Sequence, residues 1–554
     1  MPRLTTTFLL LLLGSCAQEL LERDAGMDAG PPDAGLRDGG VLGGSDSGID
    51  GGMDAGFDAG APREWVGIIG TGQSLSVGAG ANPAVSTTQA YGGLKLIETG
   101  ATTNYPLDGK GTWSTRPMTE PIRAKSNCTF CLEYPDNVNG GETPHTAMST
   151  QLSVLSLARG PREFITAHSV VGTGAMDISN IDKFGPDGGA RRPPYPASLI
   201  ETRHFKNLAA DAGFGFRTGA IVMTHGESDW ANGHYLLDLV RLHADYNADL
   251  KSITGQTTDI PMFLTQQNNF PASVDAGLSV SAELQWKSAV LYPGKFVVVG
   301  PKYQYAHGDF VHLNAPGYRR LGEKYAQVID AVLNLKQTWK PLYPIATSLS
   351  GSKVTVTFHV PFPPLAWNER MPQMHQVEHL AWKDGRAFEV LDSTGELTIV
   401  SATIVGNTVE LLLSAPPTGT GLTVRHAAQP DGANFGPSGY IYFGGQGVGR
   451  VGNLHDSDPF LGAFQVDIPV KGTAGQNKRL TVLDAGPALF VGKNDLVLAP
   501  NLPTDTLIVT RASDAGSIDL SDVWDGGLSA TTVKVRYDHR NYAVQFILPV
   551  PYTE

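Results

Sequence analysis

The sequence contains a serine, an aspartate and a histidine that could act together in hydrolysis. A serine hydroxyl becomes a nucleophile when an imidazole accepts its proton, and the imidazole needs a carboxylate to fix its tautomer. Ser74 follows Gly72 and Gln73 in a glycine-rich turn, while Asp309 and His312 are only three residues apart. Taken singly, such a serine is also a common turn residue and Asp-x-x-His a helix-start signal. Together they allow a hydrolytic triad, because one loop could present both Asp309 and His312 to a single serine.

These three residues lie in a region where short apolar runs alternate with amphipathic stretches. Strands that alternate with helices predict a parallel sheet covered by helices on both faces. A helix is expected to open at Asn314, with Pro316 in its first turn. The predicted buried strands are 65–69, 164–171, 220–223, 262–264 and 296–299.

Polar, glycine-rich blocks follow three of these strands, and a fourth block precedes the last helix. In an open parallel sheet, ligands bind outside the carboxyl ends of the strands. We therefore expect the blocks to meet at one edge of the sheet. They span 70–76, 171–176, 224–229 and 308–312.

The four blocks resemble, in order, those of the SGNH hydrolases, and most of all the branch of sialate O-acetylesterases and carbohydrate acetylesterases. Gly72-Gln73-Ser74 matches the nucleophile block, and Asp309-Phe310-Val311-His312 matches the final one. The second and third blocks of that branch correspond here to 172–174 and 226–229. The resemblance covers roughly residues 65–335 and implies a flavodoxin-like sheet and a Ser74–His312–Asp309 triad.

The same resemblance implies an oxyanion hole made by the backbone N–H groups of Ser74 and Gly174, although Gly172 is an alternative to Gly174. The third donor is Gln in this branch and Asn in the wider superfamily, whereas this chain has His225. A neutral imidazole can donate one N–H group, so His225 could serve there. A purely structural histidine is the alternative.

Other chemistries have partial signals in the same blocks. Glu227 and Asp229 could suggest glycosidase acid–base catalysis, but they lie in one tight turn. His307 with Asp309 and His312 could suggest a metal site, but no second histidine cluster supplies the remaining ligands. The dinucleotide fingerprint and the Gly-x-Ser-x-Gly elbow both lack a required glycine. No cofactor is implied.

The N-terminus predicts export and lipid anchoring. A short apolar run, 8–13, is too short to span a bilayer and leads to Cys16. This resembles a bacterial lipoprotein signal, so we expect a signal peptide at 1–15, lipidation of Cys16 and a location in the bacterial cell envelope. An ordinary secretory signal is the alternative. Residues 16–62, rich in Asp, Ala and Gly, predict a disordered tether, since a calcium repeat would need a nonapeptide spacing that is missing.

The two remaining cysteines, Cys128 and Cys131, form an even pair in an oxidising compartment. A local disulfide is the interpretation favoured by their Pro- and Asn-rich surroundings. A redox Cys-x-x-Cys would follow a strand and open a helix, and a zinc site would need two further ligands nearby.

The chain is expected to be an α/β protein with β-rich units at its C-terminal end. The predicted hydrolase domain is 63–337. Beyond it, alternating apolar residues predict a β-sandwich at 338–446 and a second β-rich unit at 447–554, or one larger β unit.

The predicted function is a serine esterase that removes acyl groups, with acetyl favoured, from an extracellular carbohydrate. The formal net charge of -13 includes an acidic tether, and no basic footprint for nucleic acid is evident. One alternative is a catalytically inactive glycan-binding or adhesion lipoprotein. This alternative stays open because His225 stands where the branch has a Gln. Another is a lipase or thioesterase of the same superfamily.

Overall fold

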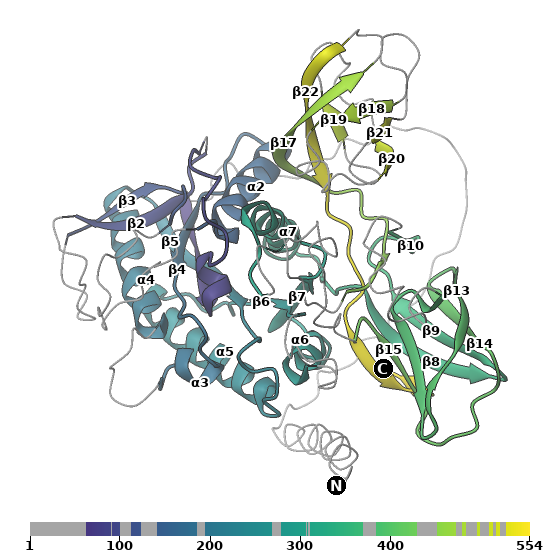
Figure 1. The fold of residues 1–554 in the computed structure, drawn as a ribbon. Helices are drawn as coiled ribbons and strands as arrows, with labels where there is room; N and C mark the ends of the chain where they lie inside the picture. Colours follow the sequence, from purple (N-terminus) through teal and green to yellow (C-terminus); the bar gives the residue numbers. More distant parts are fainter. Residues whose placement is uncertain are drawn as a thin grey trace, which may run out of the picture. The chain divides into compact units, whose positions relative to one another are not determined.

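The fold is taken from a computed structural model (Figure 1). It describes residues 63–89, 91–99, 112–122, 141–185, 194–268, 279–305, 307, 311–368, 384–428, 451–472, 479–483, 496–498, 509–513, 517–520 and 528–554. The predictions that lie outside the described residues are the signal and tether at 1–62 with Cys16, the Cys128–Cys131 disulfide, and the place of Asp309.

A seven-stranded sheet organises the first half of the described chain. Five consecutive strands, from the third position of the sheet to its far edge, are all parallel, and counted along the chain their spatial order is 2-1-3-4-5, the flavodoxin-like order. This confirms the predicted fold class. In order across the sheet, the strands are β3 (Thr112–Pro117), β2 (Leu94–Thr99), β4 (Thr166–Val170), β1 (Glu64–Gly72), β5 (Gly215–Thr224), β6 (Met262–Gln266) and β7 (Phe296–Pro301).

Helices cover both faces of this sheet. Their bounds are η1 (Ser74–Val77), α2 (Pro144–Arg159), α3 (Ile178–Ile181), α4 (Pro194–Asp211), α5 (Tyr235–Thr254), α6 (Val280–Leu291) and α7 (Ala315–Leu333). Alternate side chains of a strand point to opposite faces, so β1 contributes Ile68 to one core and Ile69 to the other. The first core also contains apolar residues of α2 and α7, and the second those of α3, α4, α5 and α6.

Local signals explain where the last helix begins. Pro316 lies in its first turn, and the side chain of Asn314 accepts a hydrogen bond from the backbone N–H of Gly317. This confirms the helix start predicted from the sequence. The cap also holds Asn314, two residues after His312, in place at the start of α7.

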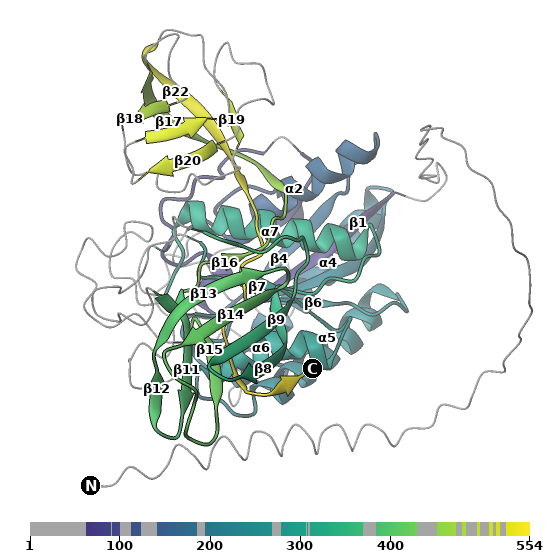
Figure 2. The same ribbon diagram turned by 90° about the vertical axis from the view of Figure 1, so that its right-hand side faces the viewer.

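The second half of the described chain is built of antiparallel strands (Figure 2). On β9, residues alternate between buried and half-buried, as expected for a strand with one face in a core. The bounds are β8 (Tyr343–Ser350), β9 (Lys353–His359), β10 (Ala366–Trp367), β11 (Phe388–Asp392), β12 (Gly395–Leu397), β13 (Ile399–Val405), β14 (Thr408–Leu413), β15 (Thr423–His426), β16 (Leu454–His455), β17 (Leu461–Gly472), β18 (Arg479–Val482), β19 (Leu496–Leu498), β20 (Val509–Ser513), β21 (Ser517–Leu520), β22 (Leu528–Asp538), β23 (Phe546–Pro549) and β24 (Tyr552–Thr553).

Two of these sheets share one apolar core and form a sandwich. One sheet has the order β12-β11-β15-β23 and the other β13-β14-β9-β8-β24. Val390, Val424 and Phe546 from the first sheet belong to the same buried cluster as Val356 and Leu411 from the second. The C-terminal strands β23 and β24 therefore complete the sandwich.

The sequence predicted two β units that follow each other in the chain, 338–446 and 447–554, whereas in the structure β23 from the second range pairs with β15 from the first. The six-stranded sheet β19-β22-β17-β18-β21-β20 lies between β15 and β23 in the chain, so it is an insertion into the sandwich. Alternating apolar residues reveal that a segment is a strand, but they do not reveal which distant strand it pairs with. None of the described helices is long and apolar enough to cross a membrane.

Candidate active site

Ser74 lies at the carboxyl end of β1, where the flavodoxin-like strand order reverses between β4 and β5. Ligands bind at this switch point in open α/β sheets. The turn depends on Gly72, which has a positive φ and packs so closely on the carbonyl of Thr224 that a side chain would collide with it. The backbone N–H of Gln73 donates to the same carbonyl (3.3 Å). Ser74 then opens the short helix η1.

The structure brings Ser74 and His312 together across 238 positions of sequence. The serine Oγ lies 2.8 Å from the imidazole Nε2. When Nε2 is unprotonated the hydroxyl donates to it, which is the geometry that a general base requires. The role of Asp309 stays a prediction, because residues 308–310 lie outside the described part of the chain.

Gly80 makes the approach of His312 possible. Its φ is positive, and a Cβ atom there would collide with the Cβ of His312. The hydroxyl of Tyr318 donates to the carbonyl of the preceding residue, Ala79 (3.2 Å), which ties this turn to α7. Nothing in the sequence singles out Gly80, because its partner is far away along the chain.

Replacing Gly80 with alanine should therefore misplace His312. We expect kcat for ester hydrolysis to fall by about 10²-fold, the usual cost of an error of about 1 Å in a catalytic group. Gly233→Ala is the matched control, because a methyl group there would meet nothing within 4 Å. Equal activity of the two variants, at equal thermal stability, would contradict this role of Gly80.

Two backbone N–H groups beside the serine suit an oxyanion. Neither the amide of Ser74 nor that of Gly174 donates to any residue in the described ranges. The two residues adjoin each other, since a Cβ atom on Gly174 would lie 3.7 Å from the Cβ of Ser74. Gly172, the alternative, instead packs against the hydroxyl of Ser76. The geometry thus favours Gly174 as the second donor.

His225 is engaged elsewhere. Its Nε2 lies 3.0 Å from the carbonyl oxygen of Met176, and its Nδ1 lies 3.1 Å from the hydroxyl of Tyr235. Burial lowers the pKa of this histidine, so the ring is neutral and carries one proton. A carbonyl only accepts, so Nε2 carries the proton and Nδ1 accepts from Tyr235. No N–H group of His225 is left for an oxyanion, and these contacts favour the structural alternative.

Glu227 and Asp229 tether the loop that follows β5. Glu227 forms a buried ion pair with Lys302, which follows β7. Asp229 accepts hydrogen bonds from the backbone N–H of Ile178 (2.7 Å) and the side chain of Asn232 (2.8 Å). Two carboxylates with these fixed structural partners do not form a glycosidase pair. Within the described ranges, no cluster of three potential metal ligands occurs.

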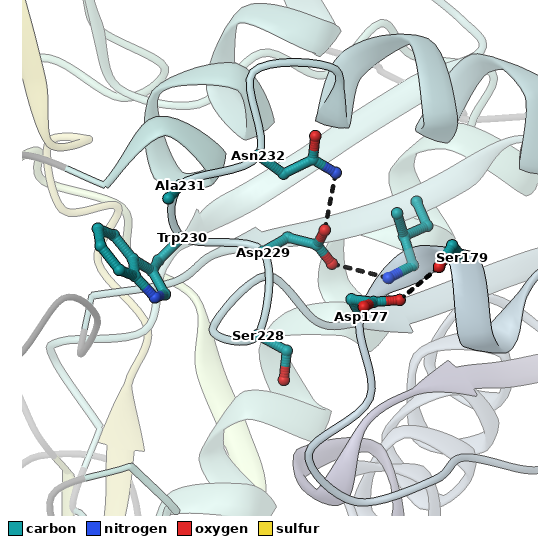
Figure 3. A pocket seen from close by; sticks show the side chains of 8 residues that line it. Asp177, Ser179, Ser228, Asp229, Trp230, Ala231 and Asn232 are labelled. Carbon is teal, nitrogen blue, oxygen red and sulfur yellow. Dashed lines mark hydrogen bonds between the residues drawn. The ribbon is translucent and has the colours of Figure 1, made fainter.

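A pocket of about 340 Å³ adjoins this loop (Figure 3). Residues 177–179, which follow β4, and residues 228–232, which follow β5, line it. Of its lining residues, only Ser228 and Asp229 lie in one of the blocks predicted from the sequence, because nothing in the sequence shows that the two loops face each other.

Comparison with known proteins gives structural neighbours only. No family model matches the chain, and no curated protein sequence matches it. A carbohydrate acetylesterase from Xanthomonas citri is 15% identical, with 70% of this chain and 77% of that chain covered and a TM-score of 0.44. NanS is 12% identical over 49% of this chain and 97% of its own, with a TM-score of 0.32. A carbohydrate acetylesterase from Sinorhizobium meliloti is 14% identical over 48% of this chain and 99% of its own, with a TM-score of 0.25.

Proposed function

We propose that this protein is a serine ester hydrolase that removes acetyl groups from a carbohydrate. The observation that carries the proposal is the hydrogen bond between Ser74 and His312 at the switch point of the sheet. A serine in a glycine turn is common, but one paired with an imidazole at this place is the arrangement of a nucleophile with its base.

The reaction follows from the positions of these groups. The Ser74 Oγ attacks the ester carbonyl while its proton passes to Nε2 of His312. The negative charge that develops on the carbonyl oxygen is held by the N–H groups of Ser74 and Gly174. His312 then protonates the leaving alcohol, and a water molecule hydrolyses the acyl-enzyme in the same manner. Asp309 is proposed to orient His312.

The carbohydrate part of the proposal has two supports. The motif resemblance extends to the branch of carbohydrate acetylesterases through the Gly72-Gln73-Ser74 block and the third block. The pocket between the two loops that flank the serine is lined by two carboxylates, two hydroxyls, one amide and one indole, together with Ile178 and Ala231. This mixture suits a polyol with an apolar face better than a long hydrocarbon chain.

The test is to assay wild type and Ser74→Ala side by side with acetylated polysaccharides and with aryl esters of increasing acyl length. We expect release of acetate by wild type, a decline in rate from acetyl to octanoyl esters, and loss of activity in Ser74→Ala. Hydrolysis that persists in Ser74→Ala would refute the assigned nucleophile. Absence of hydrolysis by wild type would favour an inactive binding protein, and a preference for octanoyl esters would favour a lipase.

We also propose that the enzyme is exported and anchored in the cell envelope through a lipid on Cys16. The support is the apolar run 8–13 followed by Cys16 and an Asp-rich tether. Expressed in a bacterial host, the full chain should fractionate with membranes and Cys16→Ser should not. Identical fractionation of the two would refute the anchor.

A further inference from the structure

The pocket beside the active site is formed by two loops that also flank Ser74. The loop after β4 passes Ser74 at Gly174 and reaches the pocket at Asp177. The loop after β5 is held to the residue before the nucleophile, because the backbone N–H of Ser228 donates to the side chain of Gln73 (3.3 Å). Both walls of the pocket therefore belong to loops that contact Ser74 or the residue before it.

Hydrogen bonds hold the walls of the pocket in place. The carboxylate of Asp229 joins the two loops by accepting a hydrogen bond from the backbone N–H of Ile178, and it also accepts one from the side chain of Asn232 in its own loop (Figure 3). The carbonyl oxygen of Trp230 accepts from the N–H of Val280 (2.8 Å) at the start of α6. The pocket is thus preformed, which lowers the entropic cost of binding a ligand.

Several polar groups in the pocket are available to a ligand. The Oδ1 atom of Asp177 accepts from Ser179 and Asn180, whereas its Oδ2 atom accepts from no residue in the described part of the chain. The hydroxyl of Ser228 and the indole N–H of Trp230 likewise have no partner among the described residues. Trp230 is 39% exposed although it is a large apolar side chain. Figure 3 shows the indole at one side of the lining residues and Asp177 at the other, with Ser228 between them. The pocket thus offers a flat apolar face at one end and polar groups at the other.

The charge of the pocket limits the class of ligand. Asp177 and Asp229 line it, and none of its described lining residues is Lys, Arg or His. Burial acts to raise the pKa of Asp177, but hydrogen bonds from Ser179 and Asn180 outweigh it and hold that pKa below its usual value. Asp177 is therefore an anion at neutral pH, and a carboxylate on the ligand would be repelled. A hydrocarbon chain would leave the polar groups unpaired.

We propose that this pocket is a subsite for one uncharged sugar ring of the acetylated substrate, with Trp230 against a face of the ring and Asp177 and Ser228 hydrogen-bonded to its hydroxyl groups. Its volume, about 340 Å³, is at the small end of the range for small-molecule sites, which suits a single ring. The inference rests on the proposed esterase function and names the part of the substrate that gives specificity.

The test compares three esters: an O-acetylated neutral methyl glycoside, O-acetylated N-acetylneuraminic acid, and ethyl acetate, whose leaving group is too small to reach Trp230. Trp230→Ala should lower kcat/KM for the acetylated glycoside by about tenfold or more, mainly through KM, and leave ethyl acetate hydrolysis within about twofold of wild type. Trp230→Phe should restore most of the activity on the glycoside. An equal loss on both esters, or no loss on the glycoside, would overturn the subsite.

Charge selection is tested with Asp177→Asn, which keeps an oxygen acceptor for the N–H of Asn180 at the start of α3. Wild type should prefer the neutral glycoside to the acetylated sialic acid, and Asp177→Asn should narrow that preference. A wild-type preference for the sialic acid would overturn the claim of an uncharged ring.

A failure of the proposed function can be distinguished from a failure of the subsite. If wild type hydrolyses no ester, the unacetylated methyl glycoside can still be titrated against the full chain while indole fluorescence is recorded. Quenching in wild type that is absent from Trp230→Phe would support the subsite alone. No change in wild-type fluorescence over the titration would overturn it.

Discussion

Ser74→Ala, His312→Ala and the double variant should each hydrolyse acetyl esters about 10⁴-fold or more slowly than wild type, with the double variant scarcely slower than either single one. Residues that act as one catalytic unit are strongly non-additive, because removing either partner already abolishes the nucleophilic step. The Ser74 Oγ and His312 Nε2 atoms are 2.8 Å apart, so each depends on the other. The measurement is kcat/KM for an aryl acetate with all four proteins.

The control for this cycle is Gly233→Ala, because a methyl group there would meet nothing within 4 Å. Its kcat/KM for the aryl acetate should stay near that of wild type. Independent, multiplicative losses in Ser74→Ala and His312→Ala would contradict a nucleophile–base pair.

Lys302→Met should destabilise the folded chain by about 3–5 kcal/mol. The side chains of Lys302 and Glu227 are 0% and 2% exposed and form an ion pair at the carboxyl ends of β7 and β5. Removing the ammonium leaves a carboxylate buried without a partner, which is the costly case for a buried ion pair. The measurement is the free energy of unfolding of wild type and of Lys302→Met, each obtained from a denaturant titration.

The double variant Lys302→Met/Glu227→Leu is the matched control. Replacing both members of a buried pair by apolar side chains is often neutral, so it should recover most of the lost stability. Because the pair also fixes the loop that carries Ser228, Lys302→Met should lower esterase activity as well. A double variant as unstable as Lys302→Met would show that the pair itself does not account for the loss.

The sequence predicted the parts of the fold that have local signals. Buried strands with continuous apolar runs and the helix capped by Asn314 were found where they were expected. The strands β2 and β3 were not predicted; β3 is the edge strand of the sheet and carries a single large apolar residue, Trp113. The return of β23 to the sandwich was missed because strand pairing over a long stretch of chain has no local signal.

In the candidate site, too, features with a sequence signal were predicted and features that depend on long-range contacts were not. The spacing of the four blocks predicted that Ser74 and His312 would meet, since carboxyl ends of parallel strands share one edge. The sequence allows His225 either an oxyanion or a structural role, and its contacts with Met176, 49 positions away, and Tyr235, 10 positions away, favour the structural one. Likewise, the sequence does not show that Trp230 and Asp177 line the same pocket, because they belong to two different loops.

The most direct test of a Ser74 nucleophile is covalent labelling with a fluorophosphonate followed by peptide mapping. The reagent phosphonylates an activated serine and mimics the tetrahedral intermediate. We expect one label per chain, on the peptide that contains Ser74, and no label in Ser74→Ala or His312→Ala. A label on another residue, or wild type that stays unlabelled while it hydrolyses esters, would contradict the assignment of Ser74.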